Sequence, residues 1–107
     1  MNQKKGAKKQ FDKADYPALL EFVPAYLHQD FGEEYGSAAE AVTAFLADAS
    51  GDEIVQVKEE WHRLYQVLGD RSLGEWQAAL RQLGGAWQPQ SVQEVQSVSE
   101  ILSRAEA

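Results

Sequence analysis

Residues 50–69 have the sequence Ser-Gly-Asp-Glu-Ile-Val-Gln-Val-Lys-Glu-Glu-Trp-His-Arg-Leu-Tyr-Gln-Val-Leu-Gly. Their main apolar side chains recur every three or four positions, which is the period of one face of an α-helix. These residues are Ile54, Val57, Trp61, Leu64 and Leu68. Ser50 and Glu53 form a capping box, in which the serine oxygen accepts an amide of the first turn and the glutamate bonds back to the cap. Gly69 then predicts a left-handed residue that closes the helix.

The same signals recur along the chain. Three further Ser-x-x-Glu boxes are each followed by apolar residues at helical spacing; they begin at Ser37, Ser72 and Ser91. The apolar residues of these stripes are Ala41, Val42, Phe45, Leu46, Leu73, Trp76, Leu80, Leu83, Val92, Val95, Val98 and Leu102. Gly84 supplies a second stop signal. The boxes are unevenly spaced and no segment alternates like a strand, so we predict an all-α compact single domain of five or six short helices, without repeats.

The region before Ser37 is less regular. Tyr16-Pro17 predicts the start of a helix that carries Leu19, Leu20 and Val23. Pro24 should end or kink this helix, because its ring clashes with the preceding turn. We expect a second short helical turn over residues 25–29, followed by a loop over residues 32–36.

The charge divides the 107-residue chain into two parts. Residues 1–13 hold five lysines against one acid, a net charge of +4, and residues 14–107 hold 16 acids against five bases, a net charge of −11. We therefore expect a flexible basic N-terminal tail over 1–13 and an acidic helical domain over 14–107. The tail is either a functional basic arm or a solubilising leader.

An acidic domain repels phosphate backbones, so it should not bind nucleic acid directly, and it attracts basic proteins. The alternative is a solvated surface that only keeps the protein soluble. The chain has no cysteine, and it has no apolar run near the length of about 18 residues that a membrane span needs. No apolar stretch follows the N-terminal lysines, so we expect a location inside the cell, without membrane binding.

A metal or acid–base site is one interpretation of His28, Asp30, Glu33 and Glu34. Zinc enzymes usually provide three ligands, often with two histidines, but the only other histidine is His62. The spacing Glu59-x-x-His62 is used by di-iron bundles, which need two such motifs. We therefore expect no metal and no cofactor.

Catalysis by other groups has no support in the residue patterns. The chain lacks a Gly-x-Ser-x-Gly motif and a Gly-rich phosphate loop. Its paired carboxylates are adjacent in sequence, so on a helix they point about 100° apart and do not converge. We expect a protein that is not an enzyme.

The aromatic residues have structural explanations. Phe45, Trp61 and Trp76 lie on apolar stripes and should be core. Trp87 lies in the loop before the last helix, where it either folds back over the core or anchors a partner. The rings of Tyr26, Phe31 and Tyr35 should pack inward while the tyrosine hydroxyls bond locally.

A family resemblance is carried by three strings. They are Tyr16-Pro17-x-Leu19-x-x-Phe22, Tyr26-Leu27-His28-Gln29-Asp30-Phe31, and Tyr35-Gly36-Ser37-x-x-Glu40-Ala41 with Phe45-Leu46. Over residues 16–83 the chain resembles the small helical immunity proteins (CdiI-like) of contact-dependent growth inhibition (CDI) systems. The resemblance implies a cytosolic stoichiometric inhibitor that binds the C-terminal domain of a CdiA-type toxin one-to-one. Many such toxins are nucleases, frequently ribonucleases, with basic clefts that an acidic protein can occupy or cover.

The resemblance does not identify the residues that contact the toxin. For that surface we predict Glu33, Glu34, Asp48, Asp52, Glu53, Glu59 and Glu60, all expected in loops or on helix faces opposite the apolar stripes. A structural role is predicted for Tyr26, His28, Gln29, Asp30 and Tyr35. His28, Gln29 and Asp30 should bond the backbone of the 32–36 loop and set the start of the helix at Ser37. The free protein should be a monomer. The alternative function is a helical adaptor or regulator that binds another basic protein.

Overall fold

The computed structural model describes residues 11–29, 31–69 and 72–105, without the side chain of Phe31. Within these ranges the chain forms helices and no strand. The elements are η1 (Lys13–Asp15), α1 (Pro17–Tyr26), α2 (Phe31–Tyr35), α3 (Ala38–Asp48), α4 (Gly51–Leu68), α5 (Leu73–Gln82) and α6 (Val92–Arg104). The predicted all-α fold is confirmed. No helix of the described part is long and apolar enough to cross a bilayer.

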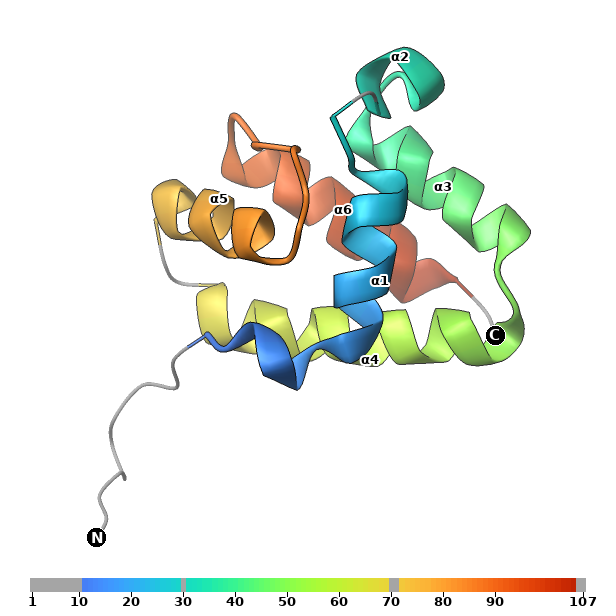
Figure 1. The fold of residues 1–107 in the computed structure, drawn as a ribbon, viewed down its shortest axis with the longest axis horizontal. Coiled ribbons are helices and arrows are strands. Elements are labelled where there is room, and N and C mark those ends of the chain that lie inside the picture. Colours follow the sequence, from blue (N-terminus) through green and yellow to red (C-terminus); the bar gives the residue numbers. More distant parts are fainter. Residues whose placement is uncertain (1–10, 30, 70–71, 106–107) are drawn as a thin grey trace, which may run out of the picture.

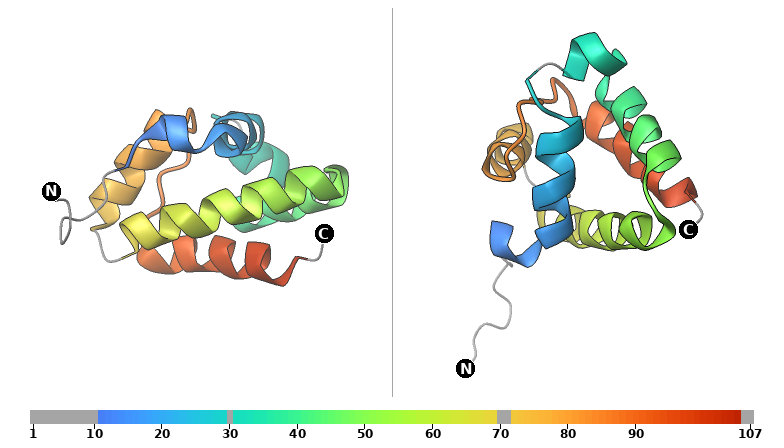
Figure 2. Two further views of the ribbon diagram at one scale, coloured as in Figure 1. Left: turned by 90° about the horizontal axis from the view of Figure 1, so that it is seen from below. Right: turned by 45° about the vertical axis from the view of Figure 1, so that its right-hand side comes forward.

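The helices pack around α4, the longest of them. Helix α1 crosses α4 on one side of the molecule, and α6 packs against α3 and α4 on the other (Figures 1 and 2). Helix α2 contacts the start of α3. All five residues of the α4 stripe are buried in the core between these elements. The arrangement leaves the outer sides of α2, α3 and α4 open to solvent.

The serine caps are present at all four predicted positions. The hydroxyl oxygens of Ser37, Ser50, Ser72 and Ser91 each accept the backbone N–H of the glutamate three residues later. At Ser50 the reciprocal bond from the Ser50 N–H to the Glu53 carboxylate is also formed, at 2.9 Å. These local bonds explain why the helix starts could be predicted from sequence.

The core aromatics also agree with expectation. Trp61 and Trp76 are buried with ring centroids 5.7 Å apart, and Phe45 is buried as well. Trp87 is 5% exposed, so it folds back over the core, and its indole N–H donates to Glu94 at 3.4 Å. Val92 does not follow the predicted stripe: it is 42% exposed, because it is the first residue of α6 and precedes the packed turns.

Pro24 was predicted to end or kink the first helix, and the prediction of an end at this residue was wrong. Helix α1 continues through Pro24 to Tyr26, and the Leu27 N–H closes the last turn on the Val23 carbonyl at 2.7 Å. The Tyr26 ring packs edge-on against Phe45 at 5.4 Å, which holds this turn against the core. No separate helix forms over residues 25–29. The expected loop over 32–36 is instead mostly α2.

The two stop glycines behave differently. Gly84 has φ +96° and its N–H bonds the Arg81 carbonyl, while the Gly85 N–H bonds the Leu80 carbonyl, as in a Schellman motif. Gly69 was predicted to be left-handed, but it lies in the right-handed helical region (φ −54°). Its N–H bonds the Tyr65 carbonyl at 2.7 Å, so it simply continues the α4 hydrogen-bond pattern.

Gly84→Ala should lower the free energy of unfolding by about 1 kcal/mol, because an L side chain is strained at positive φ. A Cβ at Gly84 meets Pro24 only at ordinary contact distance, so crowding adds little. Gly32→Ala is the matched control: it lies in α2 with no atom within 4 Å of an added Cβ. That variant should gain about 0.5 kcal/mol from helix propensity. Urea denaturation of both variants checks the difference; equal effects would contradict it.

Candidate functional site

The predicted contact carboxylates form two groups at opposite ends of α3. Glu33 and Glu34 lie on α2, and the second group consists of Asp48, Asp52 and Glu53. Glu59 lies farther along α4, where it lines a groove against α6. All six side chains are exposed. Asp52 and Glu59 are seven residues apart, so they share one face of α4 across two turns. Helix α3, with 11 residues, separates the groups by about 16 Å along its axis.

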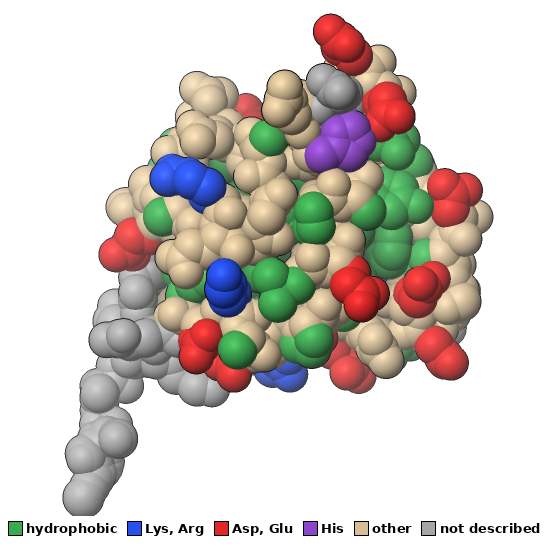
Figure 3. Space-filling model, in the orientation of Figure 1, with side chains coloured by type: hydrophobic (Ala, Val, Ile, Leu, Met, Phe, Trp, Pro, Cys, Tyr) green, Lys and Arg blue, Asp and Glu red, His purple; other side chains and the backbone are tan. Residues whose placement is uncertain are grey.

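An aromatic strip connects the two acidic groups. The rings of Tyr26 and Tyr35, the last residues of α1 and α2, stack with centroids 5.9 Å apart and planes 28° from parallel. Both side chains are half-buried. Figure 3 shows green apolar atoms between α1 and α3 with red Asp and Glu atoms around them, while the blue Lys and Arg atoms lie farther to the left. We call the two tyrosines with Glu33, Glu34, Asp48, Asp52 and Glu53 the acidic face.

Tyr26 links the strip to the second acidic group. The Asp48 carboxylate lies one turn beyond Phe45 on α3 and acts on the Tyr26 hydroxyl. Burial raises the pKa of Tyr26 above its ordinary value, and the negative charges of Asp48 and Glu53 and the Tyr35 hydroxyl raise it further. The hydroxyl is therefore protonated at neutral pH. Asp48 is 22 residues away in sequence, so this interaction is not a local one.

The His-Gln-Asp motif lies beside α2. Nε2 of His28 is 2.8 Å from Oε1 of Glu34, an ion pair when the imidazole is protonated. This contact joins the 27–29 turn to a side chain of α2. Gln29 is exposed, and Asp30 lies outside the described residues.

The described side chains contain no group of three or more His, Asp or Glu residues that could hold a metal ion. Within that same set, His28 pairs with Glu34, and His62 is exposed on α4, where its Nε2 is 3.2 Å from the Gln66 amide nitrogen. The geometry of this region consists of exposed charges around half-buried aromatic rings, and aromatic residues are enriched in protein–protein interfaces.

Comparison with protein families matches residues 15–103 to the family described as CdiI immunity protein. The match covers most of the chain. The chain belongs to the CdiI immunity protein family. It therefore acts as an immunity protein of contact-dependent growth inhibition, which binds and neutralises a cognate toxin. Neither the search of curated proteins nor the search of solved structures gave a match.

One predicted contact residue of this immunity protein is misplaced. Glu60 is only 7% exposed, so it does not lie opposite the apolar stripe as predicted. Its Oε1 accepts the Leu19 N–H at 2.9 Å. Leu19 is in the first turn of α1, where Tyr16 provides no side-chain cap. Glu60 therefore caps α1 from another helix, and we withdraw it from the contact surface.

The sequence did contain a signal for this burial. Position 60 follows Val57 by three residues and precedes Leu64 by four, so it falls within the apolar stripe of α4. Arg63, one turn further on, donates to the Asp15 carbonyl at 2.9 Å and lies 5.6 Å from the Tyr16 ring centroid. Together the two α4 side chains fix the start of α1.

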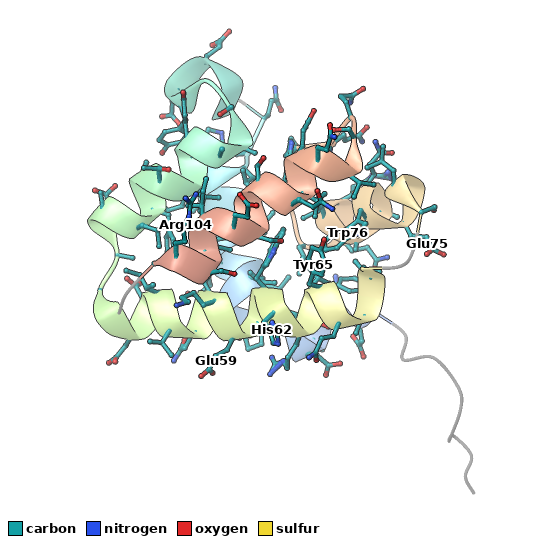
Figure 4. All side chains as sticks on the ribbon, turned by 180° about the vertical axis from the view of Figure 1, so that it is seen from behind. Glu59, His62, Tyr65, Glu75, Trp76 and Arg104 are labelled. Atoms are coloured by element: carbon teal, nitrogen blue, oxygen red, sulfur yellow. The ribbon has the colours of Figure 1, made fainter. Side chains whose placement is uncertain are left out.

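The immunity protein also has a groove between α4 and α6, with a volume of about 770 Å³. Its walls include Trp61 and Tyr65 of α4 and Leu102 of α6. The Trp61 indole N–H donates to Ser99 across it at 2.7 Å. In Figure 4, Glu59 and His62 project from the outer side of α4, and Tyr65 lies near Trp76. The groove lies on the α6 side of the molecule, whereas the aromatic strip lies between α1 and α3.

Proposed function

We propose that this immunity protein neutralises a nuclease toxin domain, and more specifically a ribonuclease, by placing the acidic face over its basic cleft in a one-to-one complex. The observation that supports this most is the arrangement of the acidic face: the stacked Tyr26–Tyr35 pair lies between two groups of exposed carboxylates. Enzymes that hold RNA need cationic clefts for its phosphates. Carboxylates at the phosphate positions exclude the substrate, and the immunity protein itself catalyses nothing.

The charge distribution also favours rapid capture. The net charge of −11 on residues 14–107 attracts a cationic partner over a distance limited by salt screening. The large apolar side chains that are exposed in the described part are Val55 and Val92, on different helices. Without a broad apolar patch there, the free protein has little reason to self-associate, which supports a monomer in the cytoplasm.

Growth rescue is the direct test of this proposal. Co-expression of the immunity protein with the toxin domain encoded beside it should restore growth of cells that the toxin alone arrests. The purified pair should elute as one complex whose mass equals the sum of one copy of each. RNA cleavage by the toxin should cease at an equimolar ratio. Rescue without loss of nuclease activity would show a different target, and absence of rescue would reject the proposal.

Salt dependence tests the electrostatic part separately. Raising NaCl from 0.05 to 0.5 M should slow association by about tenfold or more, because steering acts before contact and is screened. Dissociation should change by less than about twofold, since it depends on close contacts. Surface plasmon resonance measures both rates. Salt-independent association would remove the steering argument while leaving neutralisation intact.

A further inference from the structure

The aromatic strip differs from the other ring contacts in the molecule. Among the ring pairs of the described residues, only Tyr26–Tyr35 has both members half-buried; every other pair includes at least one buried ring. The Phe22 and Phe45 rings support Tyr26 from the core side, at 5.7 and 5.4 Å. Tyr26 is thus packed between Phe22, Phe45 and Tyr35, and the Tyr26–Tyr35 pair is partly open to solvent.

A carboxylate lies beside this pair of rings. Asp48 lies three residues after Phe45 on α3, so it shares the side of this helix that contacts the Tyr26 ring. A carboxylate can accept several hydrogen bonds with its lone pairs. Glu53 lies close enough to act electrostatically on the Tyr26 hydroxyl, and it is itself held by the Ser50 N–H. Carboxylate acceptors next to an aromatic ring suit a planar cation, because such a cation can stack on the ring and donate hydrogen bonds to the carboxylates at the same time.

We propose that Tyr26, Tyr35 and Asp48 bind the guanidinium group of an arginine in the basic cleft of the toxin. This inference rests on the proposed function, which supplies the basic partner. A guanidinium stacks on an aromatic face and donates two parallel hydrogen bonds to a carboxylate, whereas an ammonium is a compact, strongly hydrated charge. Tyrosine and arginine are enriched among the few residues that dominate binding energy. The strip is therefore the anchor, and the two acidic groups flank it.

A pair of alanine variants tests the anchor with the toxin domain. Tyr35→Ala should weaken the complex by about 30-fold, as truncation of an anchor residue does. Tyr65→Ala is the matched control: the same residue type, also half-buried and in contact with another ring, but in the α4–α6 groove. It should change affinity by less than about threefold. Tyr35→Phe keeps the ring and should bind nearly as well as the wild type.

Isothermal titration calorimetry gives the affinities, and thermal unfolding shows that each variant is folded at the titration temperature. A wild-type protein that fails to bind the toxin rejects the proposed function. The anchor proposal alone is overturned if the wild type binds the toxin and Tyr35→Ala binds it equally tightly. It is also overturned if Tyr65→Ala loses more affinity than Tyr35→Ala.

A second measurement needs no toxin. Hexa-arginine and hexa-lysine peptides carry equal charge, so they separate ring recognition from general attraction to an acidic protein. Hexa-arginine should shift the NMR resonances of the Tyr26 and Tyr35 rings and bind about threefold more tightly than hexa-lysine. Asp48→Asn, which removes the charge and keeps a side chain of similar size, should remove this preference. Equal affinity for the two peptides, or shifts confined to other residues, would overturn the anchor.

Discussion

Replacing Glu60 with alanine is expected to lower the free energy of unfolding by about 3 kcal/mol, because the substitution has three destabilising effects. The buried Leu19 N–H loses its acceptor, the start of α1 loses a negative charge near its dipole, and a cavity forms beside the core. The N-cap residue, Tyr16, makes no side-chain capping bond that could replace this acceptor. Urea denaturation followed by tryptophan fluorescence measures the change.

Two further variants separate these contributions. Glu60→Gln keeps an oxygen acceptor and should cost about 1 kcal/mol, the part that belongs to the charge. Glu59→Ala removes the neighbouring exposed carboxylate and should stay within about 0.5 kcal/mol of the wild type. If Glu59→Ala and Glu60→Ala were equally destabilising, the interhelical cap would not be a major contributor to stability.

Reversing two charges on α4 is expected to have the largest effect on toxin capture. The double variant Asp52→Lys/Glu59→Lys should associate with the toxin domain about 100-fold more slowly at low salt, within the range that electrostatic steering provides. Both side chains are exposed and lie on one helix face, so neither change disturbs the core. Stopped-flow mixing at several salt concentrations measures the association rate, and the difference from wild type should shrink as salt rises.

A single-site comparison controls for total charge. Asp52→Lys and Glu100→Lys alter the net charge equally, but Glu100 is exposed on α6, on the other side of the molecule from α1 (Figure 2). Asp52→Lys should slow association by about tenfold and Glu100→Lys by less than about threefold, if local potential rather than net charge guides the encounter. If the two variants slowed association equally, then either the toxin would bind another surface or net charge alone would control the association rate.

Sequence patterns predicted the helical elements where the signals are local. The serine at each of four helix starts bonds an amide three residues away, so its effect does not depend on the rest of the fold. Pro24 and Gly69 show the limit of such rules. Packing of Tyr26 on Phe45 carries α1 past the proline, and a continued helical hydrogen bond keeps Gly69 right-handed. In both places tertiary contacts or neighbouring turns outweigh the preference of one residue.

The amino-acid sequence by itself determined the all-helical class, the positions of the capped helix starts and the acidity of the domain, because these follow from spacings of three or four residues and from counts of charges. Only the tertiary structure decided how the carboxylates are used. It buries Glu60 under α1, brings Asp48 to Tyr26 across 22 residues, and stacks Tyr26 on Tyr35 between two acidic groups. These contacts depend on how whole helices pack, and the packing is set by the sum of many core contacts between distant segments, which no local pattern records.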